Sequence, residues 1–130
     1  MTMQDRFPRL FTPQEANALL PDLQPEVRRM LDGRDQIIQY RPDLEPTLDK
    51  AIGNGHNDLT PEVMEAFEQV RQAVEAIQGH GVLVKDVNTG LLDFPSEREG
   101  DVIFLCWRHG EPRVEHWHDV DDGYAGRQPL

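Results

Sequence analysis

The sequence predicts an α+β fold in a single domain over residues 1–130. An N-terminal antiparallel, coiled-coil-like helical hairpin is expected over 12–78, a small antiparallel sheet over 81–118 and a C-terminal tail over 119–130. Three observations predict this fold. Two stretches with apolar residues at helical spacing each follow a possible N-cap and a proline. After Gly81 the spacing of apolar residues changes to that of β-strands, and turn residues separate the apolar runs that follow.

The first helix has a clear start. Thr12 is a suitable N-cap, Pro13 suits the first helical position, and Glu15 can complete a capping box. Pro21 lacks an amide hydrogen and clashes with the preceding turn of a helix. We therefore expect a short helix over 13–20, followed by a kink or a new start at Pro21.

Apolar residues then continue at steps of three, four or seven, which is typical of a coiled-coil seam. Arg34 and Arg41 occupy positions of this seam. There they would set the register, pair with acidic residues of a neighbour, or end the seam. Pro42 and Pro46 predict another break.

The second helix follows a loop. Residues 53–58 are a loop by composition, and Thr60 with Pro61 repeats the cap-plus-proline start. The helical period runs to about Gln78, and Gly79 is expected to be a left-handed C-cap. A two-helix hairpin of this kind exposes more apolar seam than one small sheet can cover, which favours self-association.

The sheet begins with a hairpin. Residues 82–84 and 91–94 are apolar strands that flank a turn at 88–90, where glycine suits a positive φ. Residues 95–100 read as a polar loop.

A second hairpin is expected between strands at 101–107 and 113–118, joined by a two-residue turn at His109-Gly110. Counting outward from this turn places Asp101 opposite His118. Residues paired across strands share a face, so His116, two residues before His118, would lie on the same face.

This register predicts a candidate metal site. Two imidazoles at i and i+2 beside carboxylates are suitable ligands for Zn²⁺, Mn²⁺ or another borderline cation. The alternative is that His116 packs at a core edge and His118 forms an ion pair with Asp101. The candidate ligands are His116, His118, Asp101 and Asp119.

The same segment contains a candidate binding surface, because tryptophan and arginine are enriched at binding hot spots. We expect Arg108 and Glu111 to pair across the strands and the two tryptophans to lie on opposite faces. Arg127 would either clamp the tail or meet an anionic ligand. The surface comprises Trp107, Arg108, Glu111, Trp117, Tyr124 and Arg127.

Cys106 is the single cysteine, so no internal disulfide can form. Arg113, opposite it in the expected register, would lower the pKa of a reactive thiol. A lone cysteine in an apolar strand is more often a small buried hydrophobe, and we adopt this interpretation.

The net charge of the chain limits the partners that the protein can bind. A formal net charge of −11 disfavours nucleic acid and anionic membranes, because their affinity depends on Lys and Arg neutralising phosphates. The first residues lack the apolar core of a signal peptide, and no stretch is long and apolar enough to span a membrane. We expect a cytoplasmic protein.

Short segments with a specific sequence occur along nearly the whole chain. They are Phe11-Thr12, Glu15-Ala16-Asn17, Leu19-Leu20-Pro21, residues 53–57, Gly81 to Asp86, Gly90 to Pro95, Leu105 to Arg108, Gly110-Glu111-Pro112, Trp117-His118, Gly123-Tyr124, Gly126-Arg127 and Pro129. Together these segments resemble a bacterial family known as domain of unknown function 2203. The resemblance implies no activity, cofactor or catalytic residue, but it directs attention to the sheet and tail. The long helix departs from the family pattern, because Pro42 and Pro46 interrupt it.

The biochemical function does not follow from these features. The first hypothesis is a small, acidic, self-associating interaction or regulatory module without catalytic activity, acting as a homodimer or with a partner protein through its helices. The second is a metal-binding protein, including a metal-dependent hydrolase, that uses His116, His118 and nearby carboxylates.

Overall fold

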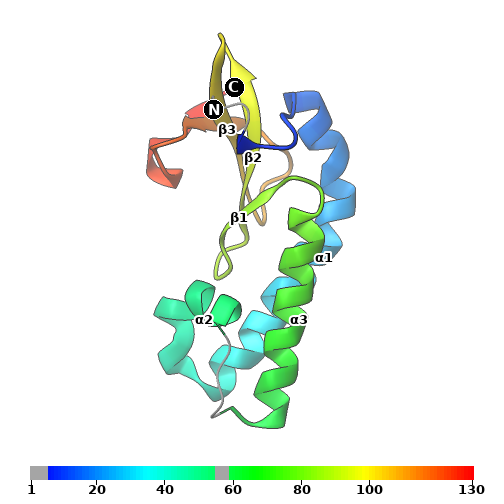
Figure 1. Ribbon diagram of the computed structural model, residues 1–130, viewed down its shortest axis with the longest axis vertical. Coiled ribbons are helices and arrows are strands. Elements are labelled where there is room, and N and C mark those ends of the chain that lie inside the picture. Colours follow the sequence, from blue (N-terminus) through cyan, green and yellow to red (C-terminus); the bar gives the residue numbers. More distant parts are fainter. Residues whose placement is uncertain (1–5, 55–58) are drawn as a thin grey trace.

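The computed structural model describes residues 6–54 and 59–130 and confirms the α+β class, with helices first and a five-stranded antiparallel sheet after them (Figure 1). The strands pair in chain order. Positions 55–58 of the expected loop lie outside the described residues. The elements are α1 (Pro13–Tyr40), η2 (Pro42–Thr47), α2 (Leu48–Asn54), α3 (Pro61–Gln78), β1 (Leu83–Asp86), β2 (Leu91–Arg98), β3 (Asp101–Arg108), β4 (His116–Asp119), η3 (Tyr124–Gly126) and β5 (Gln128–Pro129).

Helix α1 starts as predicted but is not broken at Pro21. Thr12 and Glu15 form the capping box, and the helix then continues for 28 residues through Pro21 and Pro25. Both prolines face solvent, where water can bind the carbonyl groups that they leave unpaired. The buried apolar stripe of α1 continues past them, so burial outweighs the local cost of the prolines.

Helices α1 and α3 lie side by side and run in opposite directions (Figure 1). They pack closely at Gly33, which faces Ala66 and Val70 of α3. The connection between them is longer than a simple loop, because η2 and α2 intervene. The break near Pro42 is confirmed, whereas Gly53 belongs to α2 rather than to the expected loop.

Most apolar residues of the two helices are buried or partly buried within this one chain, against each other and against the sheet, and Tyr40 and Met64 are exposed. The seam between the helices therefore does not require a partner to cover it. None of the described helices has the combination of length and apolarity that a membrane span requires.

The turn between β1 and β2 joins the sheet to the helices. Gly90 has φ +69°, as predicted for this turn. Arg34 donates to the Asn88 side chain (2.9 Å) and pairs with Glu45 (3.3 Å), so this seam arginine has partners within the chain. Asn88 also donates to the Glu45 carbonyl (2.9 Å).

Two local predictions were wrong, because the turn after α3 and the strand β2 are both longer than expected. Gly79 has a right-handed backbone, and the positive φ falls at Gly81 because the turn after α3 continues for two more residues. Residues 95–98 are not a loop, because β2 extends to Arg98 and reverses at Glu99-Gly100, where both residues have positive φ.

The predicted register of the last hairpin was wrong. His118 pairs with Phe104, and His116 pairs with Cys106, because residues 109–115 form a long connection rather than a two-residue turn. The observed pairing is displaced by three positions, an odd number, so every side chain of β4 lies on the face opposite to the expected one.

The expected tail over 119–130 is mostly structured. Residues 128–129 form β5, which pairs with β4, and the Leu130 amide donates to the Glu115 carbonyl (2.9 Å). The C-terminal segment thus closes one edge of the sheet.

The sheet has two different faces. The inner face, defined by Leu92, Phe94, Leu105 and Trp107, belongs to the main hydrophobic core with the helices. Strand residues alternate between faces, so Asp93, Phe104, Cys106, His116 and His118 lie on the other side, which we call the outer face.

The contact at Gly33 gives a stability prediction. In the Gly33→Ala variant, the new Cβ would lie 2.8 Å from Val70 Cγ2 and 3.1 Å from the Ala66 carbonyl oxygen. We expect destabilisation of about 1–3 kcal/mol, because overpacking exceeds the gain in helix propensity. Thermal and denaturant unfolding measure it.

Gly53→Ala is the matched control, because Gly53 is also helical and nothing lies within 4 Å of its added Cβ. It should stabilise the protein by up to about 1 kcal/mol. Equal effects at both positions would contradict the close packing of α1 against α3.

Candidate functional site

Three chemically reactive side chains meet on the outer face. Asp93 comes from β2, Cys106 from β3 and His118 from β4, and all three are buried, with at most 3% of their surface exposed. Asp93 pairs directly with Cys106 across the strands, and His118 lies one strand further along. A carboxylate oxygen, the thiol sulfur and an imidazole nitrogen lie within 4.8 Å of one another.

Hydrogen bonding fixes the state of the His118 ring. Its Nδ1 lies 2.8 Å from the Asp119 carbonyl oxygen, which can only accept, so Nδ1 donates. Its Nε2 lies 3.0 Å from Asp93 Oδ1. A proton must lie between these two atoms, because a nitrogen lone pair and a carboxylate oxygen would otherwise repel each other.

The buried environment favours the neutral, protonated forms of Asp93 and Cys106. Burial raises the pKa of Asp93, and the hydrogen bond and charge of His118 offset this only in part. Burial and the charge of Asp93 raise the pKa of the Cys106 thiol to about 12. Cys106 is thus a buried neutral thiol, which agrees with its interpretation as a hydrophobe and not with that as a free nucleophile.

A second group of polar side chains, centred on Arg127, borders the three residues. Arg127 donates to Glu111 Oε2 (2.7 Å) and to Nδ1 of His116, the residue paired with Cys106. A guanidinium can only donate, so the contacted Nδ1 of His116 carries no proton. The Arg127 side chain is 11% exposed, and its guanidinium lies over the Tyr124 ring, 4.6 Å from the centroid.

The predicted metal ligands do not converge as a group. His116 and His118 share the outer face, but Asp101 lies opposite Arg98 at the far end of β3. Asp119 is exposed and pairs with Ile103, so its side chain belongs to the inner face and its backbone carbonyl contacts His118.

The residues of the predicted binding surface are divided between the two faces. Glu111 binds Arg127 and the Arg108 amide (2.7 Å) rather than the Arg108 guanidinium, which lies 5.7 Å from the Tyr124 centroid. Trp107 and Trp117 both lie on the inner face, contrary to the prediction, because β4 is displaced by an odd number of residues. Arg108, Glu111, Tyr124 and Arg127 remain together.

Asp93 was not predicted as a site residue. Its position between Leu92 and Phe94 is ordinary in a strand with one face in solvent, and becomes a sign of a buried polar site only if both faces of the strand are buried. A carboxylate inside an otherwise apolar run requires a partner when it is buried.

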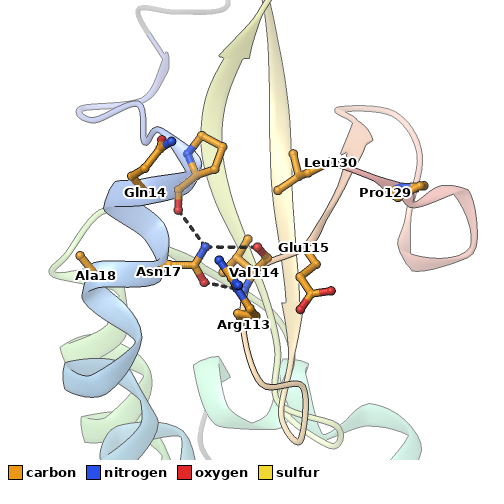
Figure 2. A pocket seen from close by; sticks show the side chains of 9 residues that line it. Gln14, Asn17, Ala18, Arg113, Val114, Glu115, Pro129 and Leu130 are labelled. Atoms are coloured by element: carbon orange, nitrogen blue, oxygen red, sulfur yellow. Dashed lines mark hydrogen bonds between the residues drawn. The ribbon is translucent and has the colours of Figure 1, made fainter.

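A hollow of about 790 Å³ lies elsewhere, between the start of α1 and the C-terminal strands. Figure 2 shows Asn17 at its wall, where the amide bonds both polar groups of the Val114 backbone (2.7 and 3.2 Å) and the Pro13 carbonyl (3.0 Å). Asn17 thus takes the place of a neighbouring strand for Val114. This contact fixes the long connection that sets the register of β4.

The fold and site define a small α+β protein in which an open antiparallel sheet holds a buried cluster of aspartate, cysteine and histidine behind its helix-covered face. The chain belongs to the family described as "Uncharacterized conserved protein (DUF2203)", which matches residues 9–130. No curated protein and no solved structure matches the chain significantly.

The Asp93 carboxyl gives a prediction about pH. Because burial raises its pKa above the ordinary 3.8, its contribution to stability is present in acid and is lost as pH rises through the raised pKa. In metal-free protein, Asp93→Asn removes this loss, and its amide can donate to His118. The melting temperature of the variant relative to the wild type should therefore rise from about pH 4 towards neutral pH.

Asp101→Asn is the matched control for this experiment, because Asp101 is exposed, and its difference from the wild type should not follow the same trend. An Asp93→Asn variant that loses relative stability towards neutral pH would show that the ionised carboxylate stabilises the fold.

Proposed function

We propose that this protein binds one Zn²⁺ ion through Asp93 Oδ1, the Cys106 thiolate and His118 Nε2. The observation that carries the proposal is the convergence of one possible ligand atom from each of these residues, at a site where a proton already bridges Asp93 Oδ1 and His118 Nε2. Cysteine sulfur favours Zn²⁺ over Mn²⁺, because thiolate is a soft ligand.

The distances support a metal in place of that proton. In a tetrahedral site with Zn–N and Zn–O bonds of about 2.0–2.1 Å, neighbouring nitrogen and oxygen ligands are about 3.3 Å apart. The present separation of 3.0 Å needs to widen only slightly.

Hydrogen bonding and charge also support it. A metal-binding histidine usually donates its other N–H to a carbonyl or carboxylate, and His118 Nδ1 already donates to the Asp119 carbonyl. A Zn²⁺ ion with one thiolate and one carboxylate has no net charge, which suits a site buried from water. Exchange of the ion for two protons leaves the charge of the site unchanged.

Burial favours metal binding over hydrolysis. Three protein ligands leave one coordination position, as in catalytic zinc sites, but all three residues are almost fully covered. A hydrolase would need this position to be open to a substrate. We therefore propose a metal-binding protein without hydrolytic activity, and a cytoplasmic location remains an expectation.

Elemental analysis of untagged protein tests the proposal. The wild type should bind one equivalent of Zn²⁺, and Cys106→Ser and His118→Ala should each lower the affinity by more than about 100-fold. His80→Ala is a matched control at an exposed histidine, and Asp101→Asn tests the ligand that was first predicted. Absence of stoichiometric zinc, or binding that Cys106→Ser leaves unchanged, would contradict the proposal.

Self-association is a second candidate function, favoured by two exposed side chains. Tyr40 at the end of α1 is 58% exposed and Met64 in the first turn of α3 is 53% exposed. They lie towards the same end of the helix pair, because the helices run in opposite directions (Figure 1). Two copies could cover this end by meeting there through their coiled-coil-like helices.

Light scattering across a concentration series tests this second proposal. A dimer should form in the wild type and weaken by about tenfold or more in Tyr40→Ser with Met64→Ser, since exposed apolar area would be lost from the contact. Tyr124→Ser, which alters an exposed aromatic far from this end, is the control. A monomer at all concentrations would exclude self-association.

A further inference from the structure

One buried donor of the described residues has no acceptor. Among their buried side-chain nitrogen and oxygen atoms, Arg127 Nε alone lacks a hydrogen-bond partner. Buried donors without an acceptor are rare, since each loses its bonds to water without replacement. The terminal nitrogen of the same guanidinium bonds Glu111 and His116, so the group is held in one orientation.

The position of Arg127 suggests an acceptor. His116, which Arg127 contacts, pairs directly with Cys106 across β3 and β4. The positive charge of Arg127 acts on the thiol and opposes the effect of burial on its pKa. Glu111 balances the charge of Arg127, so the guanidinium can remain beside a metal site without net repulsion.

We infer that Arg127 Nε donates a hydrogen bond to the Cys106 thiolate when the metal is bound. This inference rests on the proposed zinc site. A neutral thiol is a weak acceptor, whereas a metal-bound thiolate is a strong one, and donors around zinc ligands tune metal affinity. Arg127 is then a positioning residue of the site rather than a ligand.

The bond would link the metal to the C-terminal segment, defined as residues 123–130. This segment contains η3, Arg127 and β5, and it is held to β4 by strand pairing and by the Leu130 amide bond to Glu115. An additional bond formed only in the loaded state stabilises the docked segment. Zinc binding and docking of the segment therefore favour each other by the same factor.

Cobalt substitution tests the bond directly. A hydrogen bond to a metal-bound thiolate lowers the energy of its lone pairs, so the thiolate-to-cobalt charge-transfer band of the wild type should lie at shorter wavelength than that of Arg127→Gln. Arg127→Lys keeps the charge but lacks Nε, so its band should resemble that of Arg127→Gln. A band of Arg127→Lys at the wild-type position would overturn the hydrogen bond.

Affinity and hydrogen exchange complete the test. Arg127→Gln should bind zinc about 10–100-fold more weakly, whereas Arg113→Gln, at an exposed arginine, should bind as the wild type does. Zinc should slow amide exchange at Arg127 and Leu130 in the wild type only. If the wild type binds zinc but neither the charge-transfer band nor the amide exchange depends on Arg127, the hydrogen bond from Arg127 is refuted and the zinc site stands. If no metal binds, both the zinc site and the hydrogen bond are refuted.

Discussion

The contact between Asp93 and His118 is the interaction on which the outer face of the sheet depends. Two groups that each prefer water lie 3.0 Å apart in a nearly dry site, and neither is stable there without the other. The pair requires something positive between its facing atoms. A proton suffices, and a metal ion satisfies the same requirement while also engaging Cys106.

Strand register determines whether this contact exists. Asp93 and Cys106 become neighbours through the β2–β3 hairpin, whose tight reversal at Glu99-Gly100 fixes the pairing. His118 arrives by a longer route, and Asn17 holds the connection in place through the Val114 backbone (Figure 2). The helices therefore contribute to the site indirectly, by anchoring the segment that delivers the histidine.

Local signals in the sequence predicted local structure well. Thr12 with Glu15, Thr60 with Pro61, and Gly90 each specify a cap or a turn within a few residues, and each is found as expected. The α+β class followed from the change of period. Pro21 was misleading because a helix tolerates a proline on its solvent face when the opposite face is buried.

The candidate site was harder to predict, because it depends on a non-local pairing. His118 was recognised as a candidate ligand, but a two-residue turn at His109-Gly110 gave it Asp101 as a partner. The polar connection after β3 carries no residue that announces its length, since its anchor, Asn17, lies 97 positions away. Asp93 could be recognised only once both faces of β2 were known to be buried.

X-ray absorption at the zinc edge of the loaded, desalted protein tests the central claim most directly. The account predicts one sulfur at about 2.3 Å, with nitrogen and oxygen at about 2.0–2.1 Å and a single imidazole. A shell without sulfur, a shell with two imidazoles, or no zinc retained after desalting would contradict it.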